Sequence, residues 1–312
     1  MVSSRLRRWV TGVIAACLVG PGVAHAEPVT VYTSIVPVKT FVERVGGDRV
    51  AVTSLVKQGQ SPATFDPSPR ELAALGDAEL FVRVGVPFEQ AWMTRLRAAS
   101  PSLTVVDLRE RIKLRPIGGH KHAGEAGDDS TQASDTEKVV EAMPEGRVPS
   151  EVADPHIWTS PRNAVAMVES IRDALARTDP DGRAGYERNA AEYIDRLRAL
   201  DRELGERLAP YKGRRFVVFH PSWGYFADAY GLEQVAIESG GNEPGAASLD
   251  ELIREAREAD VSAVFVQDQF SQRHAHAVAD AIDAQVIAMD PLAADYIDNL
   301  ERAGDALAEA LR

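Results

Sequence analysis

The sequence predicts an α/β protein with two lobes, each a mostly parallel sheet flanked by helices, joined by a long rigid helix. Short apolar strands alternate with helices along most of the chain, which is typical of parallel sheets with helical crossovers. Residues 181–208 form one helical pattern that would run about 40 Å at 1.5 Å per residue, long enough to connect two lobes. The chain has 312 residues, about twice the usual length of one domain.

The first lobe is expected over residues 27–180. Pro69 is placed where a helix can begin, because the missing N–H of proline costs nothing at the first helical position. The predicted strands are 29–34, 49–56, 80–84 and 103–108, and the predicted helices are 40–45, 70–75 and 161–176.

The linking helix is expected over residues 181–209 and the second lobe over residues 210–312. Apolar residues recur three or four positions apart along the linking helix, from Tyr186 to Leu204. In the second lobe the predicted strands are 216–219, 263–266 and 285–289, and the predicted helices are 249–258, 275–282 and 298–311.

Residues 1–26 have the features of a secretory signal peptide. Arg5, Arg7 and Arg8 precede an apolar run too short to span a bilayer, and Ala24-His25-Ala26 has the small-residue pattern of a cleavage site. Residues 14–17 also resemble a lipoprotein box, in which Cys17 would carry the lipid. Both alternatives predict export to the periplasm.

Charge and cysteine content exclude several classes of function. The formal charge of −12 would repel a phosphate backbone, so no nucleic-acid partner is expected and cations are the more natural ligands. A single cysteine permits neither a disulfide framework nor a cysteine-based zinc site.

Residues 118–153 interrupt the strand and helix pattern. They contain eight acidic residues, three Lys or Arg, and two histidines, His120 and His122. A segment of this length without periodicity is either functional or a spacer, and both readings stay open.

Three possible metal ligands lie at the ends of predicted elements. His220 follows an apolar strand and precedes a proline, and Asp290 has the same position on another strand. His156 lies in Asp154-Pro-His just before a helix start. Since ligands of parallel sheets bind beyond the carboxyl ends of strands, these imidazoles and this carboxylate could converge on a divalent cation. A lone histidine or aspartate at such a position is more often structural, and Trp158 and Trp223 are more simply packing residues.

Five motifs carry a resemblance to a known family. They are Gly59-Gln-Ser-Pro-x-Thr-Phe-Asp-Pro-Ser-Pro69, Asp154-Pro-His-Ile-Trp-x-Ser-Pro161, Phe219-His-Pro-Ser-Trp-Gly-Tyr-Phe226, Val266-Gln-x-Gln-Phe-Ser271 and Met289-Asp-Pro-Leu292. In this order and spacing the chain resembles the periplasmic metal-binding proteins of ABC importers for zinc and manganese, in particular the zinc branch. That resemblance implies a monomeric protein that is not an enzyme and that hands a divalent ion to a membrane permease.

The resemblance assigns the metal to the space between the lobes and the ligand roles to His156, His220 and Asp290. One departure is Ala63, which stands where the family usually has a fourth ligand, a histidine. Water, Asp66, His120 or His122 could complete the tetrahedron that zinc prefers.

Zinc is the expected ion, with manganese or ferrous iron as alternatives that favour more oxygen ligands. The sequence leaves two other functions open. A metal-dependent adhesin would share the fold, and a zinc hydrolase would need a general base, for which Glu238 and Glu243 are the nearest carboxylates in the sequence.

Overall fold

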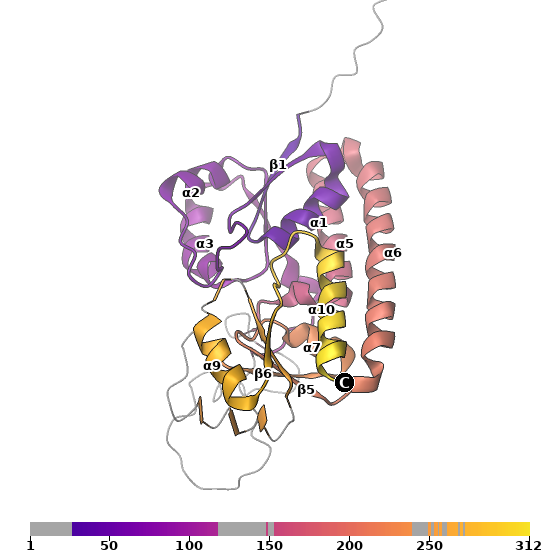
Figure 1. The fold of residues 1–312 in the computed structure, drawn as a ribbon. Coiled ribbons are helices and arrows are strands. Elements are labelled where there is room, and N and C mark those ends of the chain that lie inside the picture. Colours follow the sequence, from indigo (N-terminus) through magenta and orange to yellow (C-terminus); the bar gives the residue numbers. More distant parts are fainter. Residues whose placement is uncertain are drawn as a thin grey trace, which may run out of the picture.

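The computed structural model describes residues 27–117, 148, 153–238, 249–250, 253–254, 256–257, 261–267, 269–270 and 272–312. The predicted signal peptide with Cys17, the histidines His120 and His122, and Glu243 lie outside the described residues. Two α/β lobes lie one above the other, and long helices run beside both of them (Figure 1).

The first sheet has four parallel strands in the order β2-β1-β3-β4. Its strands are β1 (Val29–Thr33), β2 (Val50–Ser54), β3 (Leu80–Arg83) and β4 (Thr104–Asp107). β3 is buried along its whole length, as expected for a strand covered on both faces.

The helices of the first lobe are α1 (Val36–Gly46), α2 (Pro69–Gly76) and α3 (Pro87–Ala99). Proline begins α2 as predicted, and a capping box holds this helix start: Ser68 Oγ accepts from the Glu71 N–H, and the Glu71 carboxylate accepts from the Ser68 N–H. The 3-10 turns η1 (Gly47–Arg49) and η2 (Leu108–Arg111) follow α1 and β4.

The second sheet repeats this design in the order β6-β5-β7-β8, again parallel. Its elements are β5 (Arg215–Val218), α7 (Gly224–Tyr230), β6 (Glu233–Ala236), β7 (Ala263–Val266), α9 (Gln272–Ile282) and β8 (Gln285–Ala288). The repeated strand order in both lobes confirms the predicted fold class.

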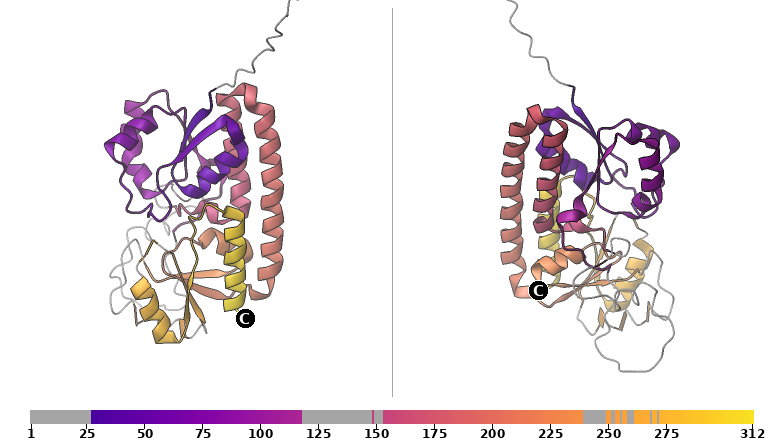
Figure 2. Two further views of the ribbon diagram at one scale, coloured as in Figure 1. Left: turned by 45° about the horizontal axis from the view of Figure 1, so that its top comes forward. Right: turned by 180° about the vertical axis from the view of Figure 1, so that it is seen from behind.

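Three long helices run side by side along the molecule, as the views in Figure 2 show. They are α5 (Pro161–Thr178), α6 (Arg183–Leu208) and α10 (Tyr296–Ala310), and η3 (Ile157–Thr159) precedes α5. The buried face of α6 contacts α1 of the first lobe and α7 and α10 of the second. At Gly304 there is no room for a side chain, because it would overlap Leu204 of α6.

A continuous hydrophobic core extends from β1 in the first lobe to Leu311 at the end of α10. A second, smaller cluster lies between the second sheet and α9. The division of the chain at residues 180 and 209 stays a prediction. Among the helices that the structure describes, none combines the length and apolarity needed to cross a membrane.

Three elements were absent from the predicted pattern. β6 is only four residues long and begins with the polar Glu233 and Gln234, so it shows no apolar run. α7 has seven residues, fewer than a helical repeat needs to be recognised. α3 buries Phe88, Met93 and Leu96 on one face, a spacing that could have been recognised.

An ion cluster fastens η1 to the start of α6. The Asp179 carboxylate accepts hydrogen bonds from Arg49 Nε (2.7 Å) and Nη2 (2.9 Å) and from the Tyr186 hydroxyl (2.6 Å). These donors hold the pKa of Asp179 at about 2, below its usual value. The ionised form is therefore favoured by the fold.

Replacing Asp179 with asparagine is expected to lower the melting temperature by a few degrees at pH 7 and to flatten the acid limb of the stability curve. The lowered pKa of Asp179 stabilises the fold at pH values above the unfolded-state pKa, which is near 4. This contribution is lost as the pH falls towards 2. Thermal melts of both proteins between pH 2 and pH 7 measure the difference. Parallel curves would show that Asp179 does not contribute in this way.

Candidate metal centre

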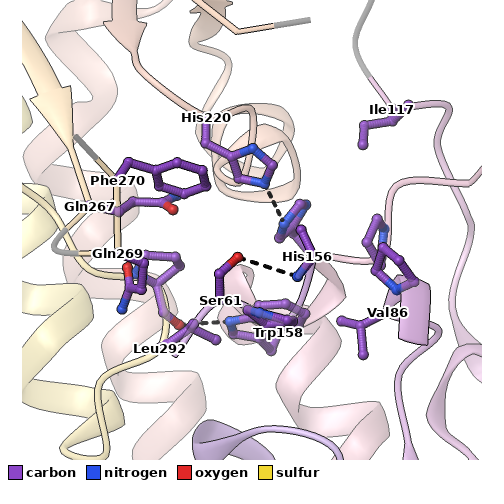
Figure 3. Close-up of a pocket in the computed structure, with 15 residues that line it drawn as sticks. Ser61, Val86, Ile117, His156, Trp158, His220, Gln267, Gln269, Phe270 and Leu292 are labelled. Atoms are coloured by element: carbon purple, nitrogen blue, oxygen red, sulfur yellow. Dashed lines mark hydrogen bonds between the residues drawn. The ribbon is translucent and has the colours of Figure 1, made fainter. Parts of the chain in front are cut away.

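Two predicted ligands meet between the lobes. His220 lies at the carboxyl end of the second sheet, two residues after β5, and His156 directly precedes η3. Their Nε2 atoms are 3.3 Å apart, although 64 positions separate the residues in the sequence (Figure 3). His156 is 8% exposed. The structure thus brings both predicted imidazoles to one point.

The Nδ1 atom of each imidazole faces a buried carboxylate. His156 Nδ1 is 2.7 Å from Asp154 Oδ1, and His220 Nδ1 is 3.1 Å from Glu238 Oε2. Asp154 is fully buried and Glu238 is 5% exposed. Because ionised carboxylates only accept hydrogen bonds, they favour the tautomer in which each Nδ1 carries the proton and each Nε2 has a free lone pair.

Electrostatics favour a neutral imidazole beside an ionised Asp154. Burial lowers the pKa of His156, although the Asp154 carboxylate acts in the opposite direction. Burial alone would raise the pKa of Asp154, but His156 and Arg115 hold it below its usual value. A neutral imidazole with a free lone pair is the form that binds a metal ion.

A cavity of about 80 Å³ adjoins the two imidazoles. Its wall is mostly apolar and includes Val86 and Trp158 from the first part of the chain and Phe270 and Leu292 from the second (Figure 3). The Phe270 ring stacks on His220 with centroids 5.0 Å apart. Such a wall limits the access of water to the two Nε2 atoms.

Trp158 connects the two lobes by hydrogen bonds beside this cavity. Its indole Nε1–H donates to the Pro291 carbonyl at 2.7 Å, and its own carbonyl accepts from the Tyr296 hydroxyl at 2.7 Å. Its ring lies 5.3 Å from that of His156. Trp158 therefore both packs and lines the cavity, whereas Trp223 is buried against Phe226, outside the cavity wall.

The third predicted ligand, Asp290, lies two residues after β8 and outside the cavity wall. Its Oδ1 accepts hydrogen bonds from Gln269 Nε2 (3.1 Å) and from the Leu292 N–H (2.9 Å). Within the described part of the chain, no three His, Cys, Asp or Glu side chains are grouped closely enough to hold a metal ion. A ligand role for Asp290 stays a prediction.

Comparisons with known proteins place the chain in a family. The profile of the family described as "ZnuA: Zinc-uptake complex component A periplasmic" matches residues 31–310. The chain belongs to this family.

Two relatives and one solved structure illustrate the family. The chain is 32% identical to the high-affinity zinc uptake system protein ZnuA of Paracoccus denitrificans, covering 92% of this chain and 93% of that one. It is 31% identical to the zinc-binding lipoprotein AdcA of Streptococcus pneumoniae, covering 84% of this chain but 50% of that protein, so the chain spans about half of AdcA. A crystal structure of ZnuA superimposes with a TM-score of 0.78 at 38% identity, covering 92% of this chain and all of that one.

Ala63, the position at which the resemblance predicts a histidine, lies on the cavity wall. Ala63 lines the cavity, and its N–H donates to Ser61 Oγ at 3.3 Å. Asp66, one of the groups considered as its replacement, is outside the cavity wall, and its Oδ1 accepts from the Trp92 indole at 3.1 Å. His120 and His122 lie outside the described residues.

From the sequence alone, Glu238 is a candidate only for the base of a possible hydrolase. Its position beside His220 follows from the parallel pairing of β5 and β6, since both residues come shortly after neighbouring strands. Ligands of parallel sheets bind beyond the carboxyl ends of strands. This principle indicates His220, and it would also indicate Glu238 if β6 were predicted from the sequence. Asp154 belongs to the Asp154-Pro-His motif, but no pattern in the sequence indicates its role beside His156.

Proposed function

We propose that this protein is an extracytoplasmic binding protein that captures Zn²⁺ and delivers it to an ABC permease. The observation that carries the proposal is the pairing of His156 and His220, with Nε2 atoms 3.3 Å apart and both Nδ1 atoms on buried carboxylates. The names of the two relatives, a zinc uptake protein and a zinc-binding lipoprotein, support the choice of ion.

The distance between the two nitrogens suits zinc. Two nitrogens at about 2.0–2.1 Å from a tetrahedral zinc ion are about 3.3–3.4 Å apart. The structure has the two Nε2 atoms in hydrogen-bond contact, and a cation between them would replace that single contact with two metal–nitrogen bonds. The site is therefore arranged for an ion before the ion arrives.

The donor set favours zinc over manganese or ferrous iron. Two imidazoles are common zinc ligands, whereas Mn²⁺ prefers a shell rich in oxygen. We propose that Asp290 and a water molecule complete the tetrahedral shell, with His120 and His122 as auxiliary ligands from residues 118–153. For Asp290 to reach the ion, its bonds to Gln269 and Leu292 would have to rearrange.

Location and partners follow from the same proposal. Residues 1–26 would direct export to the periplasm, with lipid attachment at Cys17 as the alternative to simple cleavage. The acidic chain, with a formal charge of −12, would act as a monomer without nucleic-acid partners. We infer a transport role rather than a hydrolase, because Glu238, the candidate base that the structure describes, is in hydrogen-bond contact with His220 Nδ1.

Competitive titration of Zn²⁺ against Mn²⁺, with elemental analysis of the purified mature protein, tests the function. One zinc per chain, bound more tightly than manganese and without turnover of ester or peptide substrates, is the expected result. Tighter binding of manganese would overturn the choice of ion, and turnover would favour the hydrolase. Rescue of a deletion strain by added zinc would separate transport from adhesion.

Replacing Ala63 with histidine is expected to tighten zinc binding by about 10-fold, because it adds an imidazole at the cavity wall. The same titration measures the change. Ala63→Leu is the matched control, since it adds volume without a donor and should weaken binding. A loss of affinity in Ala63→His would show that another group already occupies this corner of the shell.

A further inference from the structure

One guanidinium group touches both segments that carry the proposed ligands. Arg115 Nη1 donates to Asp154 Oδ2 at 2.9 Å, and Arg115 Nε donates to Asp228 Oδ2 at 2.9 Å. Asp154 lies two residues before His156, and Asp228 lies on α7, the helix that follows His220. Arg115 itself is outside the cavity wall, so it would not touch a bound ion.

On the His156 side, Asp154 connects the guanidinium to the imidazole. Asp154 Oδ1 accepts from the His156 N–H (3.0 Å) and faces His156 Nδ1 (2.7 Å), while Oδ2 accepts from Arg115. Oδ1 of Asp154 thus contacts His156, and Oδ2 contacts Arg115. Because Asp154 is fully buried, loss of the guanidinium would leave a buried charge without its cationic partner, and the carboxylate would have to move.

On the His220 side, the guanidinium packs on the first turn of α7. A side chain at Gly224 would overlap the guanidinium, so only glycine allows this approach. The Arg115 N–H donates to the Tyr225 hydroxyl at 3.2 Å, and that hydroxyl donates to the Asp154 carbonyl at 3.1 Å. Arg115, Asp154 and the start of α7 are therefore held as one unit.

We propose that Arg115 is a positioning residue of the metal centre, which fixes the spacing and orientation of His156 and His220. This inference rests on the proposed zinc-binding function. Arginine suits this positioning role because its planar guanidinium donates hydrogen bonds to two carboxylates in fixed directions. The single ammonium of lysine cannot reproduce this geometry.

The sign of the effect separates positioning from simple electrostatics. A cation near the site repels Zn²⁺, so if Arg115 acted through its charge alone, replacing it with methionine would strengthen zinc binding. If Arg115 positions Asp154 and α7, the same replacement weakens binding. Lost outer-shell partners of metal ligands typically reduce affinity by about 10–100-fold.

The experiment compares Arg115→Met and Arg115→Lys with the matched control Arg111→Met in the full mature chain. Arg111 makes a similar ion pair four residues earlier, at 2.8 Å to Asp173, away from the cavity. Zinc affinity is measured by competition titration, site geometry by the visible spectrum of bound Co²⁺, and stability by metal-free thermal melts. We expect Arg115→Met to lose about 10–100-fold in zinc affinity and to change the Co²⁺ spectrum. Arg115→Lys should be intermediate and Arg111→Met unchanged in both readouts.

Zinc binding by Arg115→Met that equals or exceeds wild type would overturn the proposal, even if its melting temperature falls. If that variant does not fold, Asp228→Asn provides the second test of the proposal. The Asp228 side chain is 59% exposed and can be changed without damage to the core. Asp228→Asn should weaken zinc binding several-fold, and unchanged affinity would contradict the proposal. A wild-type chain that binds no zinc would instead contradict the proposed function.

Discussion

Replacing His156 or His220 with alanine is expected to lower zinc affinity by at least about 100-fold, beyond the usual effect of losing an outer-shell partner. Each imidazole supplies one of the two nitrogens that are 3.3 Å apart. With one of them removed, the ion retains only one nitrogen of this buried pair. Competition titration against a chelator of known affinity measures the loss.

His276 provides the control for this pair of variants. It is an exposed histidine on α9 and does not line the cavity. His276→Ala should bind zinc as the wild type does and thus exclude a general effect of losing an imidazole. If either His156→Ala or His220→Ala kept wild-type affinity, that residue would be removed from the site.

Replacing Trp158 with alanine is expected to destabilise the fold by about 3–5 kcal/mol, the range for deleting a large buried aromatic side chain. Trp158 is 1% exposed, and its indole binds the Pro291 carbonyl across the lobes. The cavity beside His156 would also lose part of its wall, so zinc binding should weaken. Denaturant unfolding and zinc titration measure the two effects.

Trp158→Phe separates packing from hydrogen bonding. It keeps a ring in place but leaves the Pro291 carbonyl without its donor, for an expected cost of about 1–2 kcal/mol. Trp92→Phe is the matched control, because the Trp92 indole also donates one hydrogen bond, to the exposed Asp66, and should cost less than about 0.5 kcal/mol. Equal losses in both variants would contradict a special role for Trp158.

The fold could be predicted from the sequence because most of its elements have a clear periodicity. α6 and the buried strands β1, β3, β5 and β7 appear as apolar patterns of the right length. β6 could not be recognised in this way, since it is short and partly polar and is specified by its pairing with β5.

The candidate site was predictable only in part. His156 and His220 were selected by their position at element ends, and the structure brings them together. The roles of Glu238 and Arg115 depend on contacts between segments far apart in the chain, which no local pattern contains. Asp290 occupies the predicted strand end, but its Oδ1 is engaged by Gln269 and by the Leu292 N–H.

The zinc K-edge X-ray absorption spectrum of the protein loaded with one equivalent of Zn²⁺ tests the central claim most directly. We predict two imidazole nitrogens at about 2.0–2.1 Å, and one fewer in His156→Ala and in His220→Ala. A shell without imidazole scattering, or a spectrum unchanged in both variants, would contradict a zinc site built on His156 and His220.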